Sequence, residues 1–127
     1  MPPPEFEFGR IEATRVDKPW GYELRWGITD RYAGKVLHIK KGEALSLQYH
    51  EQKDEYHYVV RGVVDIELGM EDGVLTRHRM EAGDTLHITA GTRHRLTAIE
   101  DTDIFEVSTS EINDVVRLED RYGRAGT

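Results

Sequence analysis

The sequence predicts an all-β protein in which short antiparallel strands form a barrel or a sandwich. Apolar and polar residues alternate over many short segments, and turn signals separate these segments at close intervals. No long stretch has a helical pattern. The length of 127 residues corresponds to one domain rather than two. Many short strands without long helices are typical of an antiparallel barrel or sandwich.

The expected strands follow one another closely along the chain. They cover residues 21–26, 35–40, 44–49, 55–61, 63–68, 74–80, 85–89, 93–98 and 102–108. Glycine- and aspartate-rich turns at 41–42, 71–73, 82–84 and 90–91 are among the breaks between them. Residues 110–118 are the one segment expected to be helical, because Ser110 could cap it and Ile112, Val115 and Val116 share a face. Residues 1–15 contain three consecutive prolines at positions 2–4 and are expected to form an extended arm.

The composition argues against several classes of protein. The chain has 17 Lys and Arg residues against 24 Asp and Glu residues, a net charge of -7, and no basic run, which disfavours binding to nucleic acid or to anionic membranes. No apolar stretch approaches the ~18 residues of a membrane-spanning helix. The start lacks the charged-then-apolar pattern of a signal peptide. The absence of cysteine excludes disulfides, thiolate metal sites and cysteine nucleophiles, and we expect a cytoplasmic protein.

Alternating polar residues indicate a metal site. Gln48 and His50 point to one side of an expected strand, and Glu55 and His57 form a second such pair on the next strand. If the two strands are neighbours, Gln48, His50 and Glu55 converge, and His94 supplies a further imidazole after a tight glycine turn. Mixed nitrogen and oxygen ligands suit a first-row metal. The alternatives are a polar pair on a solvated sheet face, a turn histidine, and a glutamine that only binds a metal-bound water.

These segments resemble the paired motifs of the cupin superfamily. The residues that match the two motifs are Gly42, Gln48, His50, Glu55 and Gly62, followed by Gly83, Gly91 and His94. The resemblance implies a conserved-barrel cupin, which is a double-stranded β-helix of jelly-roll type. It also implies one divalent metal ion (Zn, Mn, Ni, Co or Fe) held by Gln48, His50, Glu55 and His94. Gln48 stands where most cupins carry a histidine, and Thr89 and Ala98 replace a usual proline and asparagine that are not ligands.

A closer resemblance is to the type II phosphomannose isomerase domain, the cupin half of bifunctional mannose-6-phosphate isomerase/mannose-1-phosphate guanylyltransferases. The matching segments lie at 19–21, 42–50 and 116–124, and the resemblance covers about residues 16–124 of a single domain, 1–127. It implies a metal-dependent isomerase that interconverts mannose 6-phosphate and fructose 6-phosphate, and a homodimer. Because the nucleotidyltransferase half has no counterpart here, no guanylyltransferase activity is expected.

The same resemblance supplies candidate catalytic and substrate-binding residues. Lys53 stands where the family usually has an arginine that looks catalytic, and it offers a point charge in place of a planar fork. His57, in a Tyr56-His57 pair that replaces His-Trp, is the candidate proton-shuttling base, or else a barrel-interior histidine bonded to a neighbour. Lys35 and Arg124 are candidate phosphate ligands. The alternatives for these two are an edge-strand lysine and a frayed tail.

Two other functions stay open. The chain could be a non-catalytic, metal-containing sugar-binding or regulatory cupin, which Lys53 and the missing partner domain favour. It could also be another cupin enzyme, such as an iron dioxygenase or a nucleotide-sugar epimerase. His38 and His78 are expected at exposed sheet positions. The aromatic residues expected to share one face, as packing or as a dimer surface, are Trp20, Tyr22 and Trp26.

Overall fold

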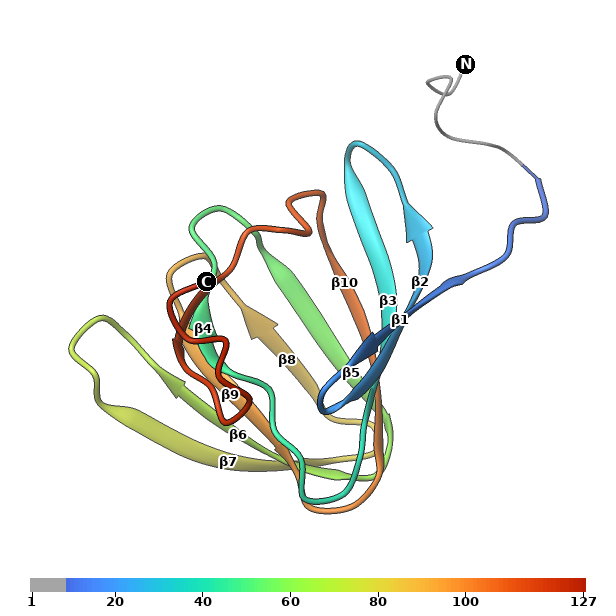
Figure 1. Ribbon diagram of the computed structural model, residues 1–127. Coiled ribbons are helices and arrows are strands. Elements are labelled where there is room, and N and C mark those ends of the chain that lie inside the picture. The colour runs from blue at the N-terminus through green and yellow to red at the C-terminus, as the bar shows by residue number, and fades with distance from the viewer. Residues whose placement is uncertain (1–8) are drawn as a thin grey trace.

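Two antiparallel sheets face each other in the computed structural model, which describes residues 9–127 (Figure 1). The first sheet has the strand order β1-β2-β3-β10-β5-β8, and the second has the order β11-β4-β9-β6-β7. The strands are β1 (Thr14–Lys18), β2 (Gly21–Ile28), β3 (Tyr32–Ile39), β4 (Leu47–Tyr49), β5 (Glu55–Arg61), β6 (Val63–Gly69), β7 (Leu75–Glu81), β8 (Thr85–Ile88), β9 (Arg93–Ala98), β10 (Thr102–Thr109) and β11 (Val116–Glu119). This arrangement confirms the predicted all-β jelly roll.

Every strand expected from the sequence is present, with small shifts at its ends. The structure adds an edge strand, β1, which pairs with β2 and includes the last two positions of the predicted arm. Residues 9–13 have no regular structure and are exposed, and the rest of the predicted arm, residues 1–8, lies outside the described residues. In the part of the chain that the structure describes, no helix has the length and apolar character required to span a membrane.

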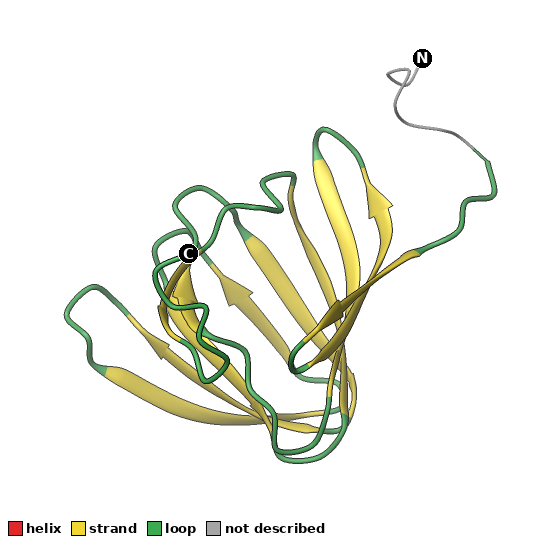
Figure 2. Cartoon of the chain, viewed as in Figure 1, coloured by secondary structure: helices red, strands yellow, loops and turns green. Residues whose placement is uncertain are grey.

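The helix predicted over residues 110–118 is wrong. This segment forms turns followed by β11, and Figure 2 draws no helix in the described residues. Val116 pairs with Tyr49 of β4, so the end of the segment extends the second sheet. Asp114, which would lie inside the helix, bonds through both its side chain and its carbonyl group to the residues around position 50. These tertiary partners satisfy the polar groups that a local helix would otherwise have paired.

The inward-facing residues divide the interior into a polar layer and an apolar layer. Along β5, Glu55 and His57 are followed on the same face by Val59, and all three are buried. The register of β10 places Glu106 opposite His57 and Ile104 opposite Val59, so like faces like across the strands. The apolar core consists of Trp20, Leu37, Ile39, Val59, Val64, Ile66, Met80, Leu96, Ala98 and Ile104. It closes one end of the interior and leaves the polar layer at the other.

The expectation that three aromatic residues share a face is wrong for Trp20. Trp20 is 3% exposed and belongs to the core, whereas Tyr22 is half-buried and Trp26 is 51% exposed. Gly21 explains the difference, since its φ is 154° and a Cβ there would lie 1.9 Å from the carbonyl oxygen of His38. The chain therefore turns at the glycine that begins β2, and the alternation of faces starts anew after Trp20.

His38 differs from its predicted exposure, whereas His78 agrees with it. The His38 ring stacks on Tyr22, with centroids 4.8 Å apart, and its Nδ1 lies 2.7 Å from Asp103 Oδ1. His78 is exposed on β7.

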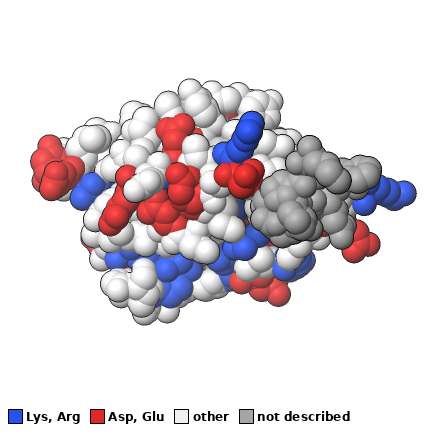
Figure 3. Space-filling view, turned by 90° about the horizontal axis from the view of Figure 1, so that it is seen from above, with Lys and Arg blue, Asp and Glu red and all other residues white. Residues whose placement is uncertain are grey.

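The face shown in Figure 3 mixes acidic and basic side chains, with several acidic ones grouped near its middle.

Candidate metal centre

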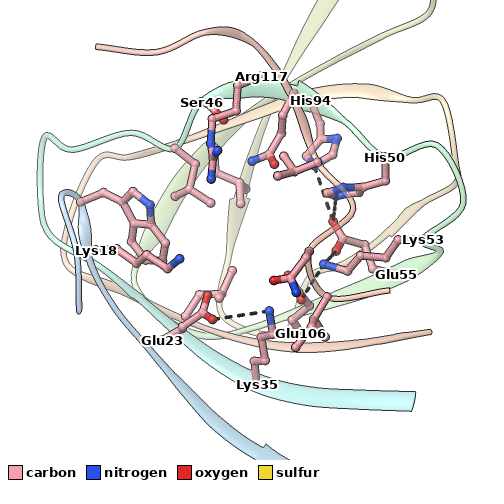
Figure 4. Close-up of a pocket in the computed structure, with 18 of the residues that line it drawn as sticks. Lys18, Glu23, Lys35, Ser46, His50, Lys53, Glu55, His94, Glu106 and Arg117 are labelled. Atoms are coloured by element: carbon pink, nitrogen blue, oxygen red, sulfur yellow. Dashed lines mark hydrogen bonds and ion pairs between the residues drawn. The ribbon is translucent and has the colours of Figure 1, made fainter. Parts of the chain in front are cut away.

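A cavity of about 340 Å³ lies between the sheets at the polar layer (Figure 4). Small-molecule sites commonly have volumes of roughly 300–1,000 Å³. The cavity is lined by all the candidate site residues taken from the sequence, namely Lys35, Gln48, His50, Lys53, Glu55, His57, His94 and Arg124. The fold thus brings residues from β3, β5, β9 and the C-terminal segment to one place.

His50, Glu55 and His94 form the tightest group in this cavity. All three are buried, and their ligand atoms lie within 4.8 Å of one another. Nε2 of His50 is 3.4 Å from Glu55 Oε1, and Nε2 of His94 is 3.5 Å from the same oxygen. The convergence occurs across the interior rather than between neighbouring strands, because Glu55 begins β5 in the first sheet and His94 lies on β9 in the second.

Hydrogen bonds on the far side of each imidazole orient the two histidines. Nδ1 of His50 donates to the carbonyl oxygen of Asp114 at 2.6 Å, and Nδ1 of His94 donates to that of Thr92 at 2.9 Å. Each Nε2 is thereby directed at Glu55, which is the usual arrangement of histidines that bind a metal. Burial lowers the pKa of His94 to about 4, against the opposing effect of Glu55, so its imidazole is neutral at pH 7. The donor set and its orientation fit a first-row divalent metal ion.

The loop between His50 and Glu55 is fixed by Asp114, a residue that the sequence analysis missed. The Asp114 carboxylate accepts hydrogen bonds from the main-chain N–H groups of Glu51, Gln52 and Lys53 at 3.0, 2.7 and 2.9 Å. No local sequence signal links positions more than 60 residues apart, so these contacts could not be found from the pattern. Asp114 holds both a candidate ligand and the loop that carries the chain to Glu55.

Gln48 lies between His94 and Arg117 in the second sheet. Its register partners are His94 on β9 and Arg117 on β11. Gln48 therefore borders the group formed by His50, Glu55 and His94, which we call the metal group. On its other side is the guanidinium-bearing Arg117. An amide oxygen is a weaker ligand than an imidazole for this class of metal.

Lys53, His57, Glu55 and Glu106 form a closed set of buried ion pairs. Nζ of Lys53 is 2.9 Å from Glu55 Oε2 and 3.3 Å from Glu106 Oε2, while Nε2 of His57 is 3.1 Å from Glu106 Oε1. Lys53 is only 5% exposed, so it is not a surface loop lysine. Glu106 was not predicted as a site residue from the sequence. It lies two positions after Ile104 on β10, so both side chains are on the inward face of that strand.

The ion pairs shift the pKa values of all four groups. Burial alone would lower the pKa of His57, but hydrogen bonds to Glu106 and Glu55 raise it to about 9. In Lys53 the two carboxylates likewise outweigh burial and raise the pKa. Burial would raise the pKa of Glu55 and of Glu106, yet the neighbouring cations hold both below the ordinary value. Without a metal, two positive and two negative charges balance here at pH 7.

The two candidate phosphate ligands are both structured, and their alternatives are wrong. Lys35 is 5% exposed on β3, which lies between β2 and β10, and its Nζ is 3.5 Å from Glu23. It is therefore not an edge-strand lysine. Arg124 is half-buried and pairs with Asp120 at 3.0 Å, and the hydroxyl of Tyr122 bonds to the main chain at residue 44. The C-terminal segment is docked rather than frayed.

Comparison with known proteins identifies the family. The cupin domain family matches residues 35–108. The xanthan biosynthesis protein XanB of Xanthomonas campestris pv. campestris is 33% identical over 124 residues, which cover 91% of this chain and 26% of that protein. The mannose-1-phosphate guanylyltransferase ManC of Salmonella typhimurium is 33% identical over 114 residues, which cover 86% of this chain and 23% of that protein.

A solved structure of similar fold is oxalate decarboxylase from Bacillus subtilis. It has a TM-score of 0.71 and 19% identity, over 91% of this chain and 35% of that one. The chain spans about a quarter of the length of the curated relatives it matches. These matches confirm the resemblance to the cupin region of mannose-1-phosphate guanylyltransferase proteins. Together with the two facing antiparallel sheets, they show that the chain belongs to the cupin domain family.

Proposed function

We propose that this cupin is a metal-dependent isomerase of sugar phosphates that interconverts mannose 6-phosphate and fructose 6-phosphate. One observation carries the proposal: His50, Glu55 and His94 converge in a cavity whose other walls hold more cations than carboxylates. The first feature suits a divalent metal, and the second suits an anionic substrate. The similarity to a mannose-1-phosphate guanylyltransferase supports a mannose phosphate as the substrate class.

The residues of the metal group have a defined task in this proposal. A divalent ion held by His50, Glu55 and His94, with Gln48 as the weakest ligand, would polarise the oxygens at C1 and C2 of the sugar as a Lewis acid. His50 and His94 would bind through Nε2, since their Nδ1 atoms already donate to carbonyl groups. Glu55 supplies the anionic oxygen between them.

We assign the proton transfer to His57 and its partner Glu106. In the aldose-to-ketose direction, a proton leaves C2 and an enediolate forms with its negative charge on O1. The hydroxyl proton at O2 then passes to O1, and a proton is delivered to C1. The hydrogen-bonded His57–Glu106 pair has a carboxylate that can accept a proton and an imidazole that can relay one. Lys53 stabilises negative charge on the enediol oxygens. Lys35 and Arg124 line the same cavity and would add positive potential for the phosphate.

A coupled assay of mannose 6-phosphate conversion to fructose 6-phosphate tests the proposal. Metal-loaded protein should turn over the substrate, and His50→Ala should abolish turnover because the metal is lost. His78→Ala is the matched control, since His78 is exposed on β7 outside the cavity. Absence of turnover by metal-loaded wild-type protein would contradict the isomerase.

A second candidate is a metal-containing cupin that binds sugar phosphates without converting them. The observation that favours it is the pairing of Lys53 with both Glu55 and Glu106, which uses its charge within the protein. Such a protein would bind mannose 6-phosphate in calorimetry and show no turnover in the same assay. The two measurements on one sample separate the candidates.

A further inference from the structure

The cations that line the cavity differ in whether a carboxylate already neutralises them. Arg25 and Lys35 share Glu23, at 2.7 and 3.5 Å. Arg124 pairs with Asp120, and Lys53 pairs with two glutamates. Within residues 9–127, by contrast, the ammonium of Lys18 has no ion-pair partner, although it lines the same cavity. In Figure 4 Lys18 lies on the opposite side of the cavity from His50 and Lys53.

Lys18 lies in a cluster of positive charge. Burial lowers its pKa, and Arg25, Lys35 and Arg117 lower it further, while Glu23 alone opposes them. Glu23 is ion-paired with Arg25 and Lys35 but not with Lys18 or Arg117, so positive charge exceeds negative charge at this end of the cavity. Cations in such a cluster repel one another unless an anion is bound among them, which is the electrostatic character of a phosphate site.

Arg117 extends this cluster from the second sheet. In the described part of the chain no carboxylate side chain lies within ion-pair distance of it, and its Nη1 makes two 3.4 Å hydrogen bonds, to the hydroxyl and the main-chain oxygen of Thr127. Burial and the neighbouring Arg124 lower its pKa, and Asp120, beyond ion-pair distance, only partly opposes them. Its guanidinium therefore remains available to an oxyanion in the cavity, to which it could present two parallel donors.

Ser46 supplies an independent sign of a ligand. Its side chain lines the cavity and is 1% exposed, yet its hydroxyl has no hydrogen-bond partner among the described residues. A buried hydroxyl without a partner costs free energy, so it is expected to bond with a group that enters the cavity. Ser46 and Gln48 are two residues apart, and Gln48 is the register partner of Arg117, so the hydroxyl is close to the cationic end.

The strand registers join this end to the metal group at the scale of one small molecule. In the second sheet Arg117, Gln48 and His94 stand side by side on β11, β4 and β9. Neighbouring strands are about 4.8 Å apart, so Arg117 and His94 are separated by roughly 10 Å of sheet. A sugar phosphate could therefore span the cavity, with its phosphate near Arg117 and its reacting carbons near His94.

We propose that Lys18, Arg117 and Ser46 form an anion subsite that binds the phosphate group of the sugar phosphate. The identity of the sugar rests on the proposed function, but the subsite itself requires only a phosphate monoester or inorganic phosphate. The ammonium, the guanidinium and the hydroxyl would each donate to phosphate oxygens, and Lys35 and Arg25 would contribute charge while they stay paired with Glu23.

Calorimetric titration with inorganic phosphate tests the subsite in the metal-containing protein. Lys18→Met and Arg117→Met should each weaken phosphate binding by about tenfold or more, and Ser46→Ala by less, because a neutral hydroxyl contributes one weaker bond. Lys41→Met is the matched control, since Lys41 is exposed and does not line the cavity. Thermal unfolding of each variant establishes that it is folded. If Arg117→Met does not fold, Lys18→Met alone tests the subsite.

A further arm separates the subsite from phosphate bound at the metal. In His50→Ala, which lacks the metal, phosphate should still bind with wild-type affinity. Loss of binding in this variant, or unchanged binding in folded Lys18→Met, would overturn the subsite. Phosphate binding through Lys18 in a protein without isomerase activity would leave the subsite standing and contradict the proposed function. Isomerase activity with an unchanged KM in Lys18→Met would support the proposed function and contradict the subsite.

Discussion

The carbonyl oxygen of Asp114 accepts a hydrogen bond from Nδ1 of His50 at 2.6 Å, which directs Nε2 of His50 at Glu55. The carboxylate of the same aspartate holds the three main-chain N–H groups that precede the turn into β5. One residue from a loop before β11 thus positions both ends of the segment that carries the first motif. Contacts of this kind commonly decide how well metal ligands are preorganised.

We predict that Asp114→Ala weakens metal binding by about 10–100-fold. The reason is that three main-chain N–H groups of the loop before Glu55 lose the carboxylate that accepts their hydrogen bonds. A competitive titration against a metal-binding dye measures the change. Asp30→Ala, at an exposed position in the β2–β3 connection, should leave the affinity unchanged. Equal affinities in the two variants would show that the loop is held without Asp114.

We predict that the metal-free protein loses stability as the pH rises from about 6.5 to about 9. The pKa of His57 is about 9 in the folded protein against an ordinary 6.5, so the folded state binds this proton more tightly. Its contribution to the free energy of unfolding, on the order of 3 kcal/mol, is fully present below pH 6.5 and is lost as the pH rises through the folded value. Urea unfolding over this range measures it. A slope in His57→Gln equal to that of wild type would contradict the assignment.

We predict that Lys53→Ala reduces turnover of mannose 6-phosphate by about tenfold or more, while Lys53→Arg retains or exceeds the wild-type rate. The enediolate carries negative charge only during the reaction, so a nearby cation acts on kcat more than on binding. Lys40→Ala, at an exposed position after β3, is the control. Equal rates in wild type and both Lys53 variants would show that the buried ion pairs of Lys53 have no role in turnover.

We predict that Gln48→His binds metal more tightly than wild type, and that Gln48→Ala binds it only slightly less tightly. Gln48 neighbours His94 in register, so an imidazole there would border the same group. Imidazole is a better ligand than an amide oxygen for first-row metals. The dye titration measures all three proteins. An affinity of Gln48→His below that of Gln48→Ala would mean that the side chain at this position does not reach the metal.

Much of the fold was accessible from the sequence, since turn residues and alternation mark each strand from β2 to β10. The convergence of His50, Glu55 and His94 was predicted, but for the wrong reason, because β4 and β5 belong to different sheets. Alternation along one strand gives the face of a side chain, whereas sheet membership depends on long-range pairing.

Other parts of the site could not be read from local pattern. Asp114 lies in a segment whose apolar spacing imitates a helix, and only its distant partners reveal its role. Lys18 precedes a proline in an unremarkable polar stretch, and its significance depends on its having no ion-pair partner among residues 9–127 of the folded chain. Glu106 carried a signal that was overlooked, namely a charge on the inward face of a buried strand.

Metal content per chain tests the central claim most directly, because the proposed chemistry depends on the group formed by His50, Glu55 and His94. Elemental analysis of purified protein should find close to one first-row divalent ion per chain in wild type and in His78→Ala. His50→Ala and Glu55→Ala should contain none, since the ligands that remain bind too weakly. A wild-type protein that contains no metal and takes up none on reconstitution would contradict the account.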